Sequence, residues 1–190
     1  MVPTPSDELI YQLKVTLLGI RPPVWRRIQV RGDITLYKLN RIIQAAMGWL
    51  GYHLFEFRIG DVAFGEPDSD WDWVKVRSAR RVRLRDIAAA LGPKGRFRYV
   101  YDFGDNWQHD VVIEKALLPE RRVRYPVCVG GRRACPPDDC GGTWGYGELL
   151  EAIRDPNHPE HKEKLEWLGG AFDPEEFDVE TTNQVLRTIR

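Results

Sequence analysis

The chain of 190 residues has no long apolar run and few cysteines. No apolar stretch approaches the roughly 20 residues that a membrane-spanning helix needs. Residues 1–8 have neither the basic start nor the apolar core of a signal peptide. The three cysteines are an odd number, which excludes a fully paired disulfide framework and fits reduced thiols. We therefore expect a cytoplasmic protein with no membrane insertion.

Net charge is also absent, because 28 basic residues balance 28 acidic ones. The charges are unevenly spread: residues 148–190 contain 11 acidic and 5 basic residues, a net of −6, so residues 1–147 carry +6. Arginine outnumbers lysine by 21 to 7, and its planar guanidinium suits bidentate contacts with phosphate. A nucleic-acid partner is one interpretation of this bias, and the codon usage of a GC-rich genome is the other.

Hydrophobic patterning predicts the secondary structure. Alternation of apolar and polar residues predicts strands, and apolar residues three to four positions apart predict helices. The predicted strands are 11–18, 24–30, 53–59, 62–64, 96–101 and 107–117. The predicted helices are 35–50 with Thr35 as its cap, 86–91, and three more between Tyr146 and Ile189, whereas 65–80 is a predicted loop.

Strands dominate the early part of the chain and helices the late part, which indicates an α+β fold. We expect a single domain over residues 9–190, preceded by a disordered tail at 1–8. The N-terminal two-thirds should form a mostly antiparallel sheet with packed helices, and the C-terminal region should be helical.

Several ordered motifs resemble those of one known family. They are Pro-Val-Trp-Arg-Arg at 23–27, Ile-Ile-Gln-Ala-Ala-Met-Gly-Trp at 42–49, His-Leu-Phe-Glu-Phe at 53–57, Tyr-Asp-Phe-Gly-Asp-Asn-Trp-Gln-His at 101–109, Cys-Pro-Pro-Asp-Asp-Cys-Gly-Gly at 135–142 and Phe-Asp-Pro-Glu-Glu-Phe-Asp at 172–178. Over nearly its whole length the chain resembles the plasmid pRiA4b ORF-3-like family. The resemblance implies an α+β domain but no defined activity. Relatives bear labels such as TnpR-like, which derive from their association with mobile elements.

Two positions depart from the pattern that this resemblance implies. Asp138 stands where members commonly have Glu, which preserves a carboxylate. Asn40 stands where they often have His, which removes a possible ligand or base. The chemistry of a serine recombinase is not indicated, because the serines of this chain all fall in the predicted tail or loop; they are Ser6, Ser69 and Ser78.

The first candidate site is the segment 102–109, which joins two predicted strands as a tight hairpin with Trp107 buried. A hairpin turn brings its ends together, so that Asp102, Asp105 and His109 could face one point. Carboxylates with a histidine suit Mg²⁺, Mn²⁺ or Zn²⁺, or a general acid and base. The alternative is that the acids only shape the turn by accepting backbone hydrogen bonds.

The second candidate site is the stretch 128–142, which holds all three cysteines among paired prolines and glycines. This composition predicts a shaped loop without helix or strand, packed against the 102–109 hairpin. Candidate zinc ligands are Cys128, Cys135 and Cys140, with a fourth from His109, His158 or His161. Only the second cysteine interval has the usual zinc spacing; buried thiols, or a Cys135–Cys140 pair that oxidises, are the alternative.

Two adjacent acids, Asp138 and Asp139, lie in the same stretch. When the loop folds against the hairpin, they would join Asp102, Asp105 and His109 in a site that resembles a metal-dependent phosphodiesterase or nuclease. Acids brought so close together need a cation or raised pKa values. The alternative is that the two acids cap the following turn.

A basic stretch follows Trp71 and Trp73. Its arginines are Arg77, Arg80, Arg81, Arg83, Arg85, Arg96 and Arg98. Basic residues interleaved with aromatic ones bind nucleic acid through phosphate contacts and base stacking, and a solvated basic face is the other interpretation.

Two functional hypotheses follow from the sequence. The first is a cytoplasmic binding or accessory module, linked to mobile elements, with a nucleic-acid or protein partner. The second is a hydrolase of the phosphodiesterase or nuclease type that uses a divalent metal and the Asp/His cluster. They differ in whether the candidate side chains meet in one place or cap separate turns.

Overall fold

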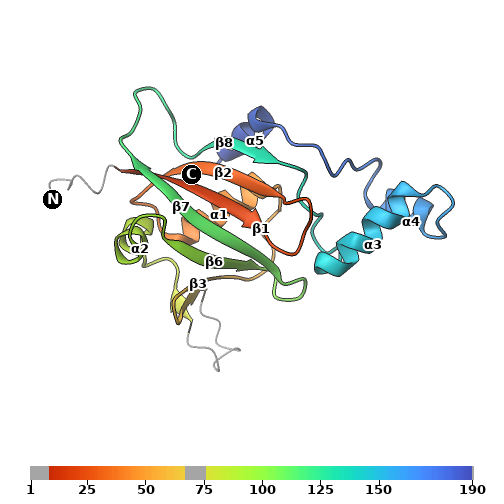
Figure 1. Ribbon diagram of the computed structural model, residues 1–190, viewed down its shortest axis with the longest axis horizontal. Coiled ribbons are helices and arrows are strands. Elements are labelled where there is room, and N and C mark those ends of the chain that lie inside the picture. Colours follow the sequence, from red (N-terminus) through yellow and green to blue (C-terminus); the bar gives the residue numbers. More distant parts are fainter. Residues whose placement is uncertain (1–8, 67–75, 190) are drawn as a thin grey trace.

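The computed structural model describes residues 9–66 and 76–189, which form a sheet with helices around it (Figure 1). The strands of the described residues are β1 (Ile10–Leu17), β2 (Trp25–Arg31), β3 (Phe55–Ile59), β4 (Val62–Gly65), β5 (Arg77–Ser78), β6 (Arg96–Tyr101), β7 (Trp107–Leu117) and β8 (Val127–Arg132). The helices are α1 (Leu36–Met47), α2 (Leu84–Leu91), α3 (Gly142–Arg154), α4 (His161–Trp167) and α5 (Val179–Leu186).

The strands lie in the order β5-β4-β3-β6-β7-β1-β2-β8. Every neighbouring pair is antiparallel except β4 with β5. Alternate residues of the central strands, such as Leu13, Val15, Ile28 and Val30, are buried in the core, as the period of a strand requires. The prediction of an α+β domain with a mostly antiparallel sheet is confirmed.

Helix α1 packs an apolar face into the core, with Leu36, Leu39 and Ile42 wholly buried. Thr35 caps the helix by accepting a hydrogen bond from the backbone N–H of Lys38 at 3.2 Å, as predicted. The helix ends at Met47, short of the predicted Leu50, because Gly48 adopts a left-handed conformation with φ of 99°. The chain then runs without regular structure to β3, and His53 lies on this connection.

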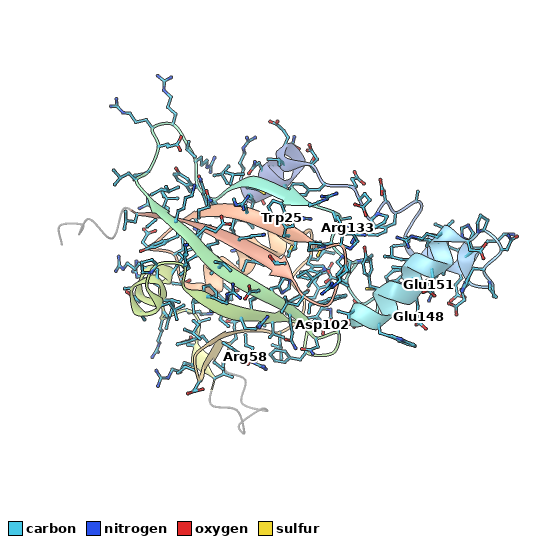
Figure 2. The ribbon with its side chains drawn as sticks, in the orientation of Figure 1. Trp25, Arg58, Asp102, Arg133, Glu148 and Glu151 are labelled. Carbon is cyan, nitrogen blue, oxygen red and sulfur yellow. The ribbon has the colours of Figure 1, made fainter. Side chains whose placement is uncertain are left out.

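Helices α3 and α4 project from one end of the sheet, and the chain then returns to α5 beside β8 (Figure 1). Glu148 and Glu151 lie along α3 on this projection (Figure 2). Arg133, which is 1% exposed, fastens the returning chain: its guanidinium donates to the carbonyl of Pro22 at 2.6 Å and to the carboxylate of Glu175 at 2.8 Å. The C-terminal region is therefore held against the β2–β8 edge of the sheet.

The prediction that residues 128–142 contain no strand is wrong for their first part. Residues 127–132 form β8, which pairs with β2 at the edge of the sheet. Glycine is required at position 131 because Phe177 packs on its backbone, and an added Cβ would lie 2.4 Å from the phenyl ring. Strand β5 likewise lies within the predicted 65–80 loop.

The hairpin prediction for the segment 102–109 is confirmed. Residues 102–106 connect β6 to β7, and Trp107 is fully buried. The predicted tail at 1–8 and the side chains of Trp71 and Trp73 lie outside the described residues. Of the helices in the described part of the chain, none has both the length and the apolar character needed to cross a membrane.

Candidate functional site

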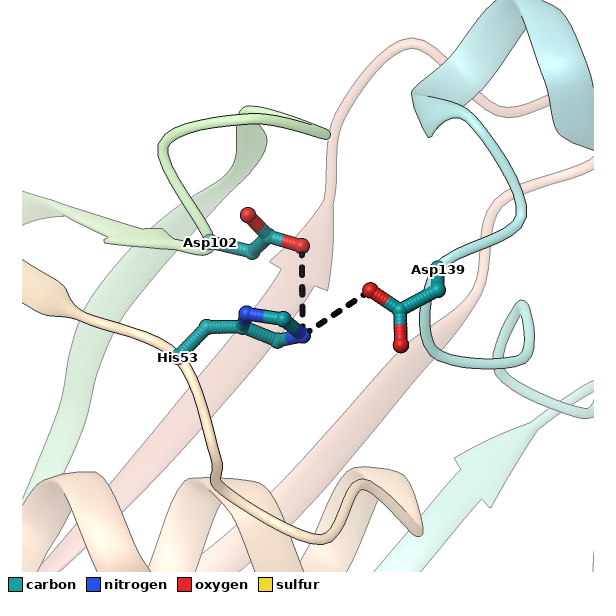
Figure 3. Close-up of side chains that lie close together, drawn as sticks. All are labelled: His53, Asp102 and Asp139. Carbon is teal, nitrogen blue, oxygen red and sulfur yellow. Dashed lines mark ion pairs between the residues drawn. The ribbon is translucent and has the colours of Figure 1, made fainter.

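Three segments far apart in sequence meet at one end of the sheet and bring together His53, Asp102 and Asp139 (Figure 3). His53 precedes β3, Asp102 follows β6, and Asp139 lies in the loop before α3. The imidazole Nε2 of His53 lies 3.7 Å from Oδ2 of Asp102 and 3.1 Å from Oδ1 of Asp139. One ligand atom from each side chain lies within 4.8 Å of the other two. We call these three residues the His53 cluster.

Asp102 is positioned by the hairpin turn that it also shapes. Its backbone is left-handed, with φ of 54°, a conformation that Asp tolerates better than most residues. Its Oδ1 accepts hydrogen bonds from the backbone N–H groups of Gly104 at 2.9 Å and Asp105 at 3.3 Å. Because Oδ1 is occupied in this way, Oδ2 is left to face His53.

Asp139 is positioned by a loop that is fastened on both sides. The neighbouring Asp138 accepts hydrogen bonds from the backbone N–H of Leu50 and the hydroxyl of Tyr101, each at 3.1 Å. On the same side, the indole N–H of Trp49 donates to the carbonyl of Pro136 at 2.8 Å. The prediction that the 128–142 stretch packs against the hairpin is confirmed.

The other side of this loop is tied to the hairpin itself. The carboxylate of Asp105 accepts a hydrogen bond from the backbone N–H of Gly141 at 3.2 Å. At Gly142, an added Cβ would lie only 2.5 Å from the carbonyl oxygen of Asp105. The backbones approach so closely that glycine is required, and the position of Asp139 relative to Asp102 is fixed.

The geometry of the His53 cluster fits ligands around a cation better than a hydrogen-bonded triad. Nε2 of His53 is buried and makes no aligned hydrogen bond, although it lies near two carboxylates. Ligand atoms about 2.1 Å from a shared ion lie about 3–4 Å from one another. One imidazole nitrogen with two carboxylate oxygens suits Zn²⁺, Mn²⁺ or Fe²⁺, and three protein ligands leave further positions open to water or another ligand.

The family can now be identified from comparisons with known proteins. The family described as plasmid pRiA4b ORF-3-like protein matches residues 9–181. The chain belongs to this family. It is 44% identical over 162 residues to the uncharacterized protein y4hQ of Sinorhizobium fredii (strain NBRC 101917 / NGR234), a match that covers 85% of this chain and 82% of that protein.

One crystal structure has the same architecture. The protein of unknown function MM3350 from Methanosarcina mazei Go1 is 40% identical to this chain and superposes with a TM-score of 0.81. The match covers 91% of this chain and 97% of that one. The two proteins therefore share the fold over almost their whole length.

The sequence predicts five acid/base candidates. In this member of the pRiA4b ORF-3-like family, two of the five, Asp102 and Asp139, lie together in the His53 cluster. Asp105 and Asp138 lie beside it and hydrogen-bond the surrounding backbone. His109 is not part of the cluster. It is wholly buried on β7, where its Nδ1 lies 3.3 Å from the carbonyl of Tyr99 and burial lowers its pKa to about 3.

His53 was missed as a ligand because the sequence predicts it as the first residue of a strand over 53–59, whereas in the structure it lies before β3, on the irregular connection from α1. The available signal was its place at the start of the His-Leu-Phe-Glu-Phe motif. A second signal was the glycine at position 51, whose left-handed φ of 75° turns the chain just before the histidine.

The cysteines do not form a zinc site in this arrangement. Among residues 9–66 and 76–189, the His53 cluster is the one group of three ligand-type side chains, and it contains no cysteine. Cys128 is buried in β8, and its thiol contacts the carbonyl of Gly130 at 3.4 Å. Burial raises the pKa of Cys135, and it raises the pKa of Cys140 to about 12. Burial therefore disfavours the thiolate form that a zinc ligand needs. Of the other histidines considered, His161 instead contacts the carbonyl of Ala152 at 2.9 Å.

The predicted nucleic-acid arginines lie on several different elements of the fold. Arg77, Arg80 and Arg81 lie in or next to β5, Arg83 precedes α2, and Arg96 and Arg98 lie on β6. Several are already engaged within the protein. Arg80 pairs with Glu66 at 2.6 Å, Arg96 pairs with Asp110 at 3.5 Å, and Arg83 donates to the carbonyl of Asp33 at 3.1 Å.

Proposed function

We propose that this protein is a metal-dependent binding module whose functional centre is a divalent ion held by His53, Asp102 and Asp139. The observation that carries the proposal is the convergence of three ligand atoms within 4.8 Å from three separate segments. Two backbone N–H groups donate hydrogen bonds to the carboxylate of Asp102. A third backbone N–H donates to the carboxylate of Asp138 and so holds the loop that carries Asp139. A site prepared in this way needs little rearrangement to bind an ion.

A cation also answers the electrostatic problem of the cluster. Two carboxylates near one imidazole nitrogen repel each other unless a positive charge lies between them. A protonated His53 is the competing source of that charge, but Nε2 makes no aligned hydrogen bond with either acid. A divalent ion attracts both carboxylates without requiring that alignment. The mixed nitrogen and oxygen ligands favour Zn²⁺, Mn²⁺ or Fe²⁺ over Ca²⁺.

The partner of such a centre would be an anion. The side chain of Asp139 is 66% exposed, so the ion would be open to solvent and able to take a phosphate or carboxylate from a bound molecule. The proposal keeps a nucleic-acid or protein partner, a link to mobile elements and a cytoplasmic location. The three free cysteines are in keeping with a reducing compartment.

The open side of the ion also favours a second candidate function, metal-dependent hydrolysis of phosphodiesters. A bound divalent ion would polarise the phosphoryl oxygen and supply an activated water. Asp105 and Asp138 would act only by holding the loop in place against the hairpin and the end of α1. Turnover of bis(p-nitrophenyl) phosphate that requires metal and disappears in Asp139→Asn would support this reaction over binding alone.

Calorimetric titration of the chelator-treated protein with Zn²⁺, Mn²⁺, Mg²⁺ and Ca²⁺ tests the proposed centre. We expect one site per chain with a preference for Zn²⁺ or Mn²⁺. Asp139→Asn should weaken it at least tenfold, because this exposed side chain accepts no hydrogen bond from the described residues and its loss should not disturb the fold. Asp61→Asn, an exposed acid in the β3–β4 turn, is the matched control. Equal binding by wild type and Asp139→Asn would refute the site.

A further inference from the structure

A groove of about 380 Å³ extends from the His53 cluster along α1 to the C-terminal residues. His53 lies at one end and Tyr37 at the other, with Gln44 and Trp49 between them. Val185 and Ile189 from the C-terminal part of the chain also line it. We call it the α1 groove.

The walls of the α1 groove are aromatic and apolar where a soluble surface is usually polar. Tyr52 and Leu50 are each 70% exposed, and Val185 is 45% exposed. Phe55 and Trp49 extend the same surface inward. A contiguous group of large exposed apolar side chains commonly marks a binding site, and aromatic rings beside a cleft favour a planar ligand.

The floor of the groove is polar and incompletely satisfied. Asn40 and Gln44 line it, although both are nine-tenths or more buried. Gln44 Nε2 donates to the hydroxyl of Tyr99, which in turn donates to Oδ1 of Asn40 at 2.6 Å. These two hydrogen bonds fix the orientation of the Gln44 amide and leave its Oε1 buried without a hydrogen-bond partner. Buried acceptors are rarely left unpaired, so Oε1 calls for an N–H or O–H donor.

Positive charge lies beside the groove and at its near end. Arg41 is exposed beside the floor and has no ion-pair partner in the described part of the chain. At the far end, the guanidinium of Arg80 stacks on Tyr37 with 3.5 Å to the ring centroid, and Glu66 neutralises part of its charge. At the near end lies the His53 cluster with its proposed ion. A ligand in the groove therefore meets the guanidinium of Arg41 beside the aromatic side chains and the proposed ion at the near end.

We propose that the α1 groove binds a nucleotide unit. The base lies against Tyr52 and donates an N–H to Gln44, and the phosphate is held by Arg41 and by the ion at the His53 cluster. This inference deepens the proposed function, on which its phosphate contact at the cluster rests. The same chemistry is offered by a free mononucleotide and by a single-stranded nucleic acid, and the experiment below distinguishes these two sources.

Fluorescence anisotropy and calorimetry at low salt provide the test, with AMP, GMP, CMP and UMP as free nucleotides and fluorescein-labelled 12-residue DNA and RNA strands of mixed sequence. We expect Tyr52→Ala to weaken binding about tenfold, as loss of one stacking ring does for single strands. Arg41→Gln should weaken it and also reduce its dependence on salt. Trp144→Ala is the matched control, because Trp144 is 76% exposed on α3 and does not line the groove.

The pattern of results separates the possibilities. Comparable affinity for mononucleotides and strands identifies a free nucleotide, and much tighter strand binding identifies a single-stranded nucleic acid; both support the groove. Absence of binding to every nucleotide probe, or binding that Trp144→Ala weakens and Tyr52→Ala does not, would overturn it. The metal titration is a separate readout. A protein that binds Mn²⁺ but no nucleotide retains the proposed function and loses this inference. One that binds nucleotide but no metal overturns the proposed function and, with it, the phosphate contact at the His53 cluster.

Discussion

Replacement of Asp102 separates two roles that the structure assigns to one side chain. Oδ1 shapes the hairpin turn through the N–H groups of Gly104 and Asp105, and Oδ2 faces His53. Asparagine keeps an acceptor for the turn and tolerates the left-handed backbone, but it removes the negative charge that an ion requires. In the absence of metal, Asp102→Asn should therefore unfold with a free energy within about 0.5 kcal/mol of wild type.

Asp102→Ala removes both roles. Two backbone N–H groups lose their acceptor, at about 0.5–1.5 kcal/mol each, and alanine at φ of 54° adds about 1 kcal/mol. We expect the metal-free variant to lose about 2–4 kcal/mol of unfolding free energy. For a domain of this size, that loss corresponds to a decrease in Tm of about 4–16 °C.

Metal adds a second, independent signal. At a free ion concentration of 100 times Kd, the wild type should gain about 2.7 kcal/mol of unfolding free energy, which is about 5–11 °C in Tm. Neither variant should show this gain. Thermal melts of the three proteins with chelator and with Mn²⁺ or Zn²⁺ provide the assay. An Asp102→Asn variant that keeps the full metal-dependent increase in Tm would refute the ligand role and leave only the turn.

Three further predictions concern the surroundings of the site. Burial lowers the pKa of His109 to about 3, so the unfolded chain takes up a proton that the folded chain does not; stability should fall by about 1.4 kcal/mol per pH unit as pH decreases from about 6.5 to 3. His109→Gln should flatten that slope in urea melts, and an unchanged slope would contradict the assignment. Gly142→Ala should destabilise the protein by about 1–3 kcal/mol and weaken metal binding, because the Asp139 loop must move away from the hairpin; unchanged metal affinity would argue against this coupling. Glu175→Gln removes the anion that faces buried Arg133 and should lower the unfolding free energy by about 1–2 kcal/mol, whereas the neighbouring Glu176→Gln should not, and equal losses would show that the pair has no specific role.

Most of the fold could be predicted because its determinants are local. The alternation in β1, β2 and β7 sets which side chains face the core, and Thr35 and Asp178 cap their helices in the way their residue types predict. Strand β8 was missed because its glycines have low strand propensity. The close packing on Gly131 comes from Phe177, which is distant in sequence.

The candidate site could be predicted only in part. Asp102 and Asp139 stood in recognisable turn motifs, and the packing of their two segments followed from composition. His109 could have been excluded: it lies two residues after Trp107 on one strand and therefore points to the same buried side. His53 depends on the path of the chain between α1 and β3, which local patterning does not determine.

A crystal of the protein grown with Mn²⁺ or Zn²⁺, and measured at the absorption edge of the ion, would show whether the His53 cluster holds a metal. We expect a single anomalous peak about 2.0–2.3 Å from Nε2 of His53 and from one carboxylate oxygen each of Asp102 and Asp139. An empty cluster, with the His53 imidazole in a straight hydrogen bond to the carboxylate of Asp139, would contradict it.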